Sequence, residues 1–502
     1  MNLRATLHNE FGYDRFRPGQ LAACKSAVAG DDTIVLMPTG SGKSLCYQLP
    51  GYELPGVTVI VNPLISLAED QARHLQELDF SAVVLNSSRT KKQLAESEEK
   101  LRNGEVEYLF TTPERLQNTD LCEIIAEVGV DILVIDEAHC VCQWGHDFRP
   151  DYLSLAYTRQ RLGNPPILAM TATATPSMID EIKHILKLND PKIISTGVFR
   201  ENIELRVERK IGDDAKQERL RELLTDQHGL HIGKPAIVYV ATTKCVDELA
   251  DFLQGVGLKT FRYHGRMRKK DRFQNQHDFL DEPTGVMVAT NAFGLGIDMP
   301  DIRQVIHYHL PGSIESYYQE VGRAGRDGEP ALCTLLYDPE DLKIQKLFAS
   351  GSSDSCQLAS GHHTLVRGLK DSGNFPDGSV AIKDLNKISP YGSTTLKRCF
   401  HQLASYGVVA PAGRGKWRCV LPEVRHSLFD QIARSGEERI EQAKWGVKAM
   451  QEFAESHGCR WQKILQTFES DEDITSAEIC CDCCQPATIS SQAAPVSTTA
   501  SV

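Results

Sequence analysis

A glycine-rich segment near the N-terminus carries residue types that hold phosphate groups. Between an apolar run and a stretch of helical period stand Thr39, Gly40, Ser41, Gly42, Lys43 and Ser44. Glycines let backbone N–H groups wrap around phosphates, Lys43 can reach the β- and γ-phosphates, and Ser44 can ligate magnesium. The segment predicts a nucleoside-triphosphate site that uses magnesium, although Met37 replaces the usual first glycine. A simple strand-to-helix turn is the alternative.

Two carboxylates follow another apolar run. Asp136 and Glu137 come directly after Ile132–Ile135. One carboxylate at such a place can hold magnesium, while its neighbour orients or deprotonates an attacking water. Alone, these residues would usually form a solvated loop or a helix cap. A phosphate loop in the same chain favours the catalytic interpretation.

Two arginines stand three residues apart in the glycine-containing segment Gln319–Gly328. On a helix Arg323 and Arg326 would share one face, and either could reach a γ-phosphate across a cleft. Gln319 is a further nucleotide-binding candidate. An exposed, salt-bridged helix end is the alternative, but the phosphate loop needs such a partner.

Short apolar runs alternate with amphipathic stretches from Thr33 to about Tyr337, which is typical of buried parallel strands in α/β domains. One series comprises residues 33–37, 57–61, 132–135 and 166–170, and a second comprises residues 236–240, 285–289 and 304–307. The stretch Gly197–Asp214 separates the two series. We therefore expect two α/β lobes, at residues 1–200 and 201–345, with the phosphate loop in the first and the arginines in the second.

Residues 355–425 have a different character. Expected helices at Val380–Ile388 and Thr394–Tyr406 precede an expected hairpin at Val408–Val420, a pattern typical of a winged helix. Between residues 360 and 425 ten basic residues oppose four acidic ones, although the net charge of the chain is −12. A solvated basic face competes with a role in binding duplex nucleic acid, for which the candidates are Lys397, Arg398, Arg414, Lys416 and Arg418.

Five cysteines follow a helix expected at Ser427–Ser456. They are Cys459 and a cluster with two overlapping C-x-x-C pairs, Cys480, Cys481, Cys483 and Cys484. A tetrahedral structural zinc needs four thiolates, so which three join Cys459 stays open. Free surface thiols are the alternative. We expect a helical zinc-binding module at residues 426–486 and a disordered tail at residues 487–502.

The composition is that of an ordinary soluble globular protein. The 502 residues are 41% hydrophobic and 24% charged, enough for about three or four domains. The chain has no apolar run long enough to cross a bilayer and no N-terminal segment that resembles a signal peptide. The other ten cysteines are scattered, which favours reduced thiols in a cytoplasmic protein. Net negative charge does not exclude nucleic acid, because local basic surface binds phosphate.

Further segments resemble motifs of the RecQ family of DNA helicases, within superfamily two. The most specific follows the DEAH sequence at residues 136–139 and is similar to the family's aromatic-rich loop, with Gln143, Trp144, His146, Phe148 and Arg149. In that loop bases stack on aromatic rings and arginine binds phosphate. Residues 11–20 resemble the family's adenine-recognition motif, which would place Gln20 at the adenine edge and the ring between Tyr13 and Arg17.

The resemblance covers about residues 3–340 and implies two tandem RecA-like lobes, use of ATP and magnesium, and Arg326 as the arginine finger. It also implies a zinc-binding module and 3′ to 5′ translocation on single-stranded DNA. The implied partners are single-stranded and tailed duplex DNA, met by a monomer during repair, recombination or replication restart. Such a protein would be cytoplasmic, and nucleoid-associated in a prokaryote.

The order of the last domains departs from the family, in which the zinc module precedes the winged helix. Two other functions remain open. An RNA helicase uses the same two lobes, although the aromatic loop and the winged helix argue against it. A nucleotide switch would hydrolyse ATP without displacing a strand.

Overall fold

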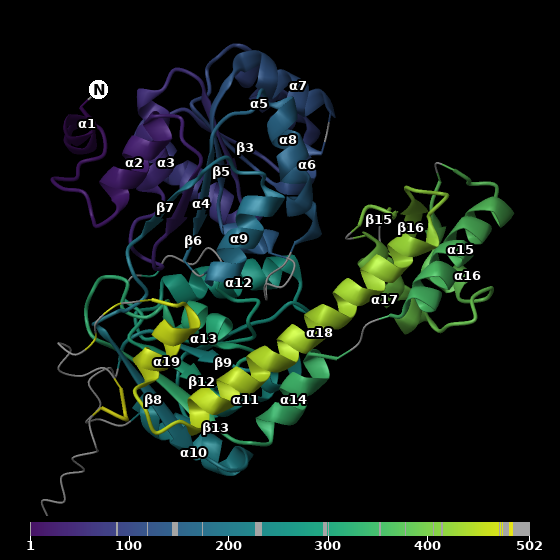
Figure 1. Ribbon diagram of the computed structural model, residues 1–502. Helices are drawn as coiled ribbons and strands as arrows, with labels where there is room; N and C mark the ends of the chain where they lie inside the picture. The colour runs from purple at the N-terminus through teal and green to yellow at the C-terminus, as the bar shows by residue number, and fades with distance from the viewer. Residues whose placement is uncertain are drawn as a thin grey trace, which may run out of the picture.

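The computed structural model describes residues 2–86, 89–117, 119–142, 149–172, 174–225, 233–294, 299, 301–350, 353–376, 378–404, 406–412, 415–470, 472, 474 and 481–484. Within these residues the chain forms two α/β lobes in contact and a smaller domain set apart from them (Figure 1). No helix in this part of the chain is both long and apolar enough to cross a membrane.

The first lobe is built on a seven-stranded sheet. Its strands, in the spatial order β3-β4-β2-β5-β6-β1-β7, are β1 (Thr33–Leu36), β2 (Val57–Val61), β3 (Ala82–Leu85), β4 (Tyr108–Thr111), β5 (Val130–Ile135), β6 (Ile167–Thr171) and β7 (Lys192–Ser195). The described pairings are parallel. Four strands match predicted apolar runs. The other three, β3, β4 and β7, match none of the predicted runs; β3 and β4 are buried, whereas the side chains of the edge strand β7 are largely exposed and half polar.

Helices cover both faces of this sheet and bury an apolar core on each. They are α1 (Leu3–Asn9), α2 (Gln20–Val28), α3 (Leu45–Glu53), α4 (Ile65–Glu77), α5 (Lys91–Arg102), α6 (Pro113–Leu116), α7 (Thr119–Val128), α8 (Leu155–Arg161) and α9 (Pro176–Ile185), with the 3₁₀ turns η1 (Ala138–Val141) and η2 (Pro150–Ser154). Because the strands are parallel, the phosphate loop and the two carboxylates emerge at the same edge of the sheet.

The second lobe repeats the design with six parallel strands. In the spatial order β10-β11-β9-β12-β13-β8 these are β8 (Ile203–Arg209), β9 (Ala236–Tyr239), β10 (Thr260–Tyr263), β11 (Val286–Ala289), β12 (Gln304–His307) and β13 (Ala331–Tyr337). The helices are α10 (Asp213–Thr225), α11 (Thr243–Gly255), α12 (Lys269–Leu280), α13 (Ile314–Val321) and α14 (Asp341–Phe348). The predicted pair of α/β lobes is confirmed.

The small domain is a winged helix, as predicted. It consists of α15 (Ser355–Asp371), β14 (Val380–Ala381), α16 (Ile382–Leu385), α17 (Ser393–Ala404), β15 (Val409–Pro411) and β16 (Lys416–Cys419), with a three-stranded sheet in the order β14-β16-β15. The expected helix at Val380–Ile388 is wrong at both ends, in its first two and its last three residues. The first two pair with β16 through Val380 and Trp417, and the helix behind them is one turn long.

A 30-residue helix, α18 (His426–Glu455), connects the winged helix to the lobes (Figure 1). Near its start Phe429 and Ile432 pack in the core of the winged helix, whereas near its end Met450 and Phe453 pack in the core of the second lobe. Helix α19 (Arg460–Thr467) follows and buries Trp461 in that same second-lobe core. Residues 426–486, expected to form a separate zinc module, therefore divide between two hydrophobic cores: the start of α18 belongs to the winged helix, and the end of α18 and α19 belong to the second lobe.

Candidate functional site

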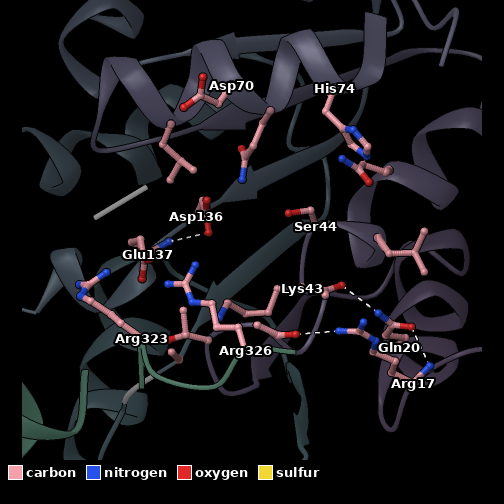
Figure 2. A pocket seen from close by; sticks show the side chains of 18 of the residues that line it. Arg17, Gln20, Lys43, Ser44, Asp70, His74, Asp136, Glu137, Arg323 and Arg326 are labelled. Carbon is pink, nitrogen blue, oxygen red and sulfur yellow. Dashed lines mark hydrogen bonds between the residues drawn. The ribbon is translucent and has the colours of Figure 1, made fainter. Parts of the chain in front are cut away.

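A cleft of about 720 Å³ lies between the two lobes and receives side chains from both (Figure 2). The predicted nucleotide residues that line it are Tyr13, Arg17, Gln20, Thr39, Gly40, Gly42, Lys43, Ser44, Asp136, Glu137, Gln319, Arg323 and Arg326. Ser41 lies in the same loop, where its hydroxyl donates to the carbonyl of Pro38 at 2.7 Å. The structure thus brings together residues that are more than 300 positions apart in the chain.

The phosphate loop has the backbone that its glycines allow. Gly40 and Gly42 have φ angles of +81° and +80°, in the left-handed region that favours glycine. Lys43 Nζ donates to the carbonyls of Met37 (3.0 Å) and Pro38 (3.3 Å). Burial lowers the pKa of Lys43, and this effect outweighs the nearby carboxylates that act in the opposite direction. A buried ammonium held by backbone carbonyls is well prepared to receive a phosphate anion.

The arginine segment of the second lobe, Gln319–Gly328, contacts this loop directly. A Cβ atom built on Gly40 would lie 3.0 Å from Arg326 Cβ, and one built on Gly322 would lie 3.5 Å from Thr39 Oγ1. Arg323 is 5% exposed and donates through Nη1 to the carbonyl of Gly294. Lys43 and Arg326 therefore face one crevice, with Arg323 held at its second-lobe wall.

The two carboxylates occupy different environments. Asp136 is buried, and its carboxylate accepts from Asn62 Nδ2 (2.9 Å) and from the backbone N–H of Glu137 (3.0 Å). Burial, followed by the charge of Glu137, raises the pKa of Asp136 to about 6. Glu137 has a left-handed backbone (φ 49°, ψ 50°), which is strained for a residue with a side chain. Its Oε2 lies 3.4 Å from Nδ1 of the buried His139.

The segment that resembles an adenine-recognition motif, residues 11–20, is hydrogen-bonded to the phosphate loop. Gln20 Nε2 donates to the carbonyls of Gly42 (2.9 Å) and Ser41 (3.3 Å), and its Oε1 accepts from the backbone N–H of Arg17 (2.8 Å). Arg17 Nη1 donates to the carbonyl of Gly40 at 2.7 Å, while Tyr13 is 50% exposed at the edge of the cleft. A group that binds next to Gln20 would thus act on the loop that holds the phosphates.

Several lining residues have no counterpart among the predicted ones. They come from α4 and α12, which close the cleft from the two lobes, and they include Asp70, Gln71, Arg73, His74, Gln276 and Leu280. These helices carry no chemical motif, so only the fold could reveal their position. Arg200, between β7 and β8, was also missed, although its guanidinium contacts both lobes.

A second groove, of about 1020 Å³, follows the carboxyl ends of the second-lobe strands. Thr290 after β11 and His309 after β12 line it, together with α9 of the first lobe and the exposed Trp445 of α18. Helix α13 contributes Glu315 and Glu320 to this groove, whereas residues at and just beyond its end line the first cleft. One helix therefore forms part of both cavities.

Nine of the ten predicted nucleic-acid residues divide into three groups. Gln143, Trp144, His146, Phe148 and Arg414 lie outside the described residues. Arg149 belongs to the first lobe, where its Nη1 donates to the carbonyl of Pro63 at 2.5 Å. On the winged helix, the exposed residues are Lys397, Lys416 and Arg418.

Arg398 differs from these three side chains in its exposure and its partners. It is partly buried, and it donates to Ser353 Oγ (3.0 Å) and Gln357 Oε1 (3.4 Å). Its guanidinium thus attaches α17 to the start of α15. The sequence places it beside Lys397 but cannot show that it turns inward.

Three of the five C-terminal cysteines converge. The sulfur of Cys481 lies 3.9 Å from that of Cys459 and 3.6 Å from that of Cys484, and the three could hold one metal ion. Burial raises the pKa of Cys481, but hydrogen bonds from backbone N–H groups more than offset this and lower it overall. Cys483 instead directs its sulfur to the carbonyl of Ser456, at 3.9 Å. Cys480 lies outside the described residues.

Comparison with known families matches each lobe. Residues 17–182 match the DEAD/DEAH box helicase family, and residues 215–328 match the helicase conserved C-terminal domain. The Mycobacterium smegmatis helicase Lhr, solved with ssDNA and AMP-PNP, has a TM-score of 0.56 (20% identity, 87% of this chain and 62% of that chain). S. cerevisiae Dbp5 bound to RNA and ADP BeF3 has a TM-score of 0.55 (18% identity, 69% and 90%). These likenesses show the two-lobe fold alone.

Sequence relatives are more specific. The chain is 42% identical over 346 residues to the probable ATP-dependent DNA helicase RecS of Bacillus subtilis, covering 68% of each protein. It is 39% identical over 351 residues to the ATP-dependent DNA helicase RecQ of the same organism, covering 70% of this chain but only 58% of that protein. These identities show that the chain belongs to the RecQ family of ATP-dependent DNA helicases.

Proposed function

We propose that this protein uses ATP hydrolysis to move 3′ to 5′ along single-stranded DNA and to unwind duplexes in repair or recombination. The observation that carries the proposal is the position of Lys43 and Arg326 in one interlobe cleft. Because each lobe supplies one cation, a single nucleotide can hold the lobes together, and its hydrolysis can release them.

The residues of the cleft suit the steps of hydrolysis. The Ser44 hydroxyl and the Asp136 carboxylate would hold a magnesium ion, which neutralises phosphate charge when bound. Glu137 would orient the attacking water and accept its proton as the bond between the β- and γ-phosphates breaks. Lys43 and Arg326 would stabilise the charge on the γ-phosphoryl oxygens from opposite sides.

The second groove supports a path for the DNA strand. It follows strand ends of the second lobe and reaches α9 of the first, so a bound strand would contact both lobes. Helix α13 offers a mechanical link to the ATP cleft, because Glu320, paired with His307 at 2.8 Å, lines the groove while Gln319 lines the cleft. The exposed Lys416 and Arg418 would bind the duplex ahead of the motor.

We propose that Cys459, Cys481 and Cys484 bind a structural zinc ion with a fourth ligand. Three sulfur atoms within 4.8 Å of one another fit three corners of a tetrahedral thiolate site. The site lies beside the second-lobe sheet, since the backbone N–H of Asp482 donates to the carbonyl of Leu205 in β8. A bound zinc would therefore fix the C-terminal segment to the edge of that sheet.

A strand-displacement assay on tailed duplexes tests the proposal. We expect ATP-dependent unwinding of a duplex with a 3′ single-stranded tail, and little unwinding of one with a 5′ tail. ATP hydrolysis without strand release from either substrate would indicate a nucleotide switch instead. Zinc content measured on the same preparation should be about one equivalent per chain.

An RNA helicase is the second candidate, because the fold is shared with S. cerevisiae Dbp5 bound to RNA. The identities of about 40% to DNA helicases favour DNA. Stimulation of ATP hydrolysis by single-stranded DNA and by RNA of the same length separates the two. Stimulation by RNA alone would contradict our proposal.

A further inference from the structure

The segment that joins the two lobes carries an arginine that contacts both of them. Residues 196–202 connect β7 of the first lobe to β8 of the second. Arg200 Nη1 donates to the carbonyl of Thr39 in the phosphate loop (3.3 Å). Its Nη2 donates to the carbonyls of Gly325 (2.6 Å) and Ala324 (3.3 Å) in the arginine segment. The guanidinium therefore lies between the two segments that meet in the ATP cleft.

The carbonyls that Arg200 binds stand next to the residues that would touch the γ-phosphate. Thr39 is followed by Gly40, whose backbone packs against Arg326. The second-lobe carbonyls belong to the two residues directly before Arg326. Arg200 itself is not among the residues that line the ATP cleft, so any effect on hydrolysis must act through these neighbours.

The backbone around Arg200 is held by the second lobe and the C-terminal segment. The carboxylate of Glu472 accepts hydrogen bonds from the backbone N–H groups of Val198 and Phe199. The Phe199 ring packs edge-to-face against Trp461, with 5.2 Å between the ring centroids. Arg200 should therefore move with the second lobe, and its bond to the phosphate loop is the contact that must break when the lobes separate.

We propose that Arg200 is a positioning residue that holds the phosphate loop and the arginine segment at the spacing required for hydrolysis. A planar guanidinium presents five donors in fixed directions and can bind carbonyls on two sides at once. A lysine ammonium carries the same charge on a flexible stem and lacks this fork. The inference rests on the proposed ATP-driven motor, in which closing of the cleft forms the Arg200–Thr39 contact and opening breaks it.

Three variants of the full chain test this role. Arg200→Ala removes the bridge, Arg200→Lys keeps the charge without the fork, and Arg206→Ala is the matched control. Arg206, in the adjoining strand β8, binds Glu204 of the same strand at 2.6 Å. The measurements are kcat and KM for ATP with saturating single-stranded DNA. Lobe closure is followed by energy transfer between dyes on unnatural residues placed at the exposed Lys92 and Lys244, upon addition of a non-hydrolysable ATP analogue.

We expect Arg200→Ala to lower kcat about tenfold or more with KM changed less than about threefold, because the neighbouring phosphate loop and Arg326 lose the spacing that the transition state requires, whereas ground-state binding is kept. The closure signal should fall as well. Arg200→Lys should recover neither readout, whereas Arg206→Ala should match the wild type in both. Melting temperatures close to that of the control would show that the variants are folded.

Two results would overturn the inference: wild-type kcat and closure in Arg200→Ala, or full recovery of both in Arg200→Lys. The second would reduce Arg200 to a simple positive charge. A wild-type protein that hydrolyses no ATP would count against the proposed function instead. The closure measurement would still decide the role of Arg200, because it needs nucleotide binding but no hydrolysis.

Discussion

The ATP cleft and the cysteine cluster are built in opposite ways. The cleft gathers charged side chains from both lobes and removes them from water, so that burial lowers the pKa of Lys43 and raises that of Asp136 to about 6. The cluster brings together the sulfur atoms of Cys459, Cys481 and Cys484, and backbone N–H groups lower the pKa of Cys481. We therefore expect the buried charges of the cleft to lower the stability of the fold while they serve hydrolysis, and the cluster to connect segments of the fold.

Because of this difference, we expect substitutions in the cleft to affect activity and substitutions in the cluster to affect folding. Removing a buried charge from the cleft should abolish hydrolysis and leave the fold intact or more stable. Removing a converging thiol should first weaken the attachment of the C-terminal segment to the second lobe.

The largest effect is expected from Lys43→Ala. Hydrolysis should fall about a thousandfold or more, because the variant loses the first-lobe cation that faces the β- and γ-phosphates. The melting temperature should equal or exceed that of the wild type, since burial disfavours this ammonium. Phosphate release and scanning calorimetry on one preparation measure both. A Lys43→Ala protein that is both inactive and unfolded would contradict the expectation that the cleft serves activity and not folding.

In the cysteine cluster, Cys481→Ser should lose the proposed zinc ion and melt about 5 °C or more below the wild type. Cys481 is the sulfur that lies close to both Cys459 and Cys484. Cys483→Ser is the matched control and should keep the metal, because the Cys483 sulfur is directed to Ser456. Metal analysis and thermal unfolding measure the two variants. Loss of zinc from Cys483→Ser alone would show that the ligand set is different.

The pH dependence of hydrolysis tests the role of Asp136 in the cleft. Because the pKa of Asp136 is raised to about 6, kcat/KM for ATP should fall about tenfold per pH unit below that value as the carboxylate is protonated and loses magnesium. More magnesium should move this acid limb to lower pH. An acid limb near pH 4, independent of magnesium, would contradict the assignment.

The same raised pKa predicts a stability effect of known sign. A folded-state pKa above the ordinary value means that Asp136 favours folding most at low pH and disfavours it once ionised, as pH rises through about 6. Asp136→Asn should therefore be inactive but unfold at the same or a higher temperature than the wild type at pH 8. A clear loss of stability at pH 8 would show that its hydrogen bonds outweigh its burial.

The smallest effect concerns the winged helix. The double variant Lys416→Ala with Arg418→Ala should weaken duplex binding about two- to fivefold at moderate salt, since each exposed cation supplies one screened phosphate contact. Arg398→Ala should leave binding unchanged and lower the melting temperature of the winged helix, because its guanidinium contacts Ser353 and Gln357. Titrations with labelled duplex decide. Equal losses of duplex affinity in both variants would indicate that Arg398 also contacts the duplex.

Much of the cleft could be predicted because its residues stand at the ends of apolar runs. Lys43 follows the predicted strand β1 and Asp136 the predicted strand β5, and parallel strands bring such ends to one edge of a sheet. Arg326 needed the additional knowledge that two lobes face each other. Arg200 could not be predicted, because it belongs to a connection without periodic pattern, and only the closed arrangement shows what it contacts.

The C-terminal third was harder to predict for a different reason. The adjacent cysteines offer overlapping spacings, and the choice of Cys481 and Cys484 depends on how the segment lies against β8 and α19. Likewise, a helical period predicts α18 but does not show that Met450 and Phe453 enter the second-lobe core. Local pattern specifies the elements there, whereas long-range packing specifies their partners.

Single-turnover ATP hydrolysis by Arg326→Ala, measured together with its affinity for a non-hydrolysable ATP analogue, tests whether both lobes act on one nucleotide. Arg326 belongs to the second lobe, while the phosphate loop belongs to the first. If the two lobes act on one nucleotide, the analogue should bind with nearly wild-type affinity and hydrolysis should slow about a thousandfold. Hydrolysis at the wild-type rate would show that the second lobe takes no part in the reaction.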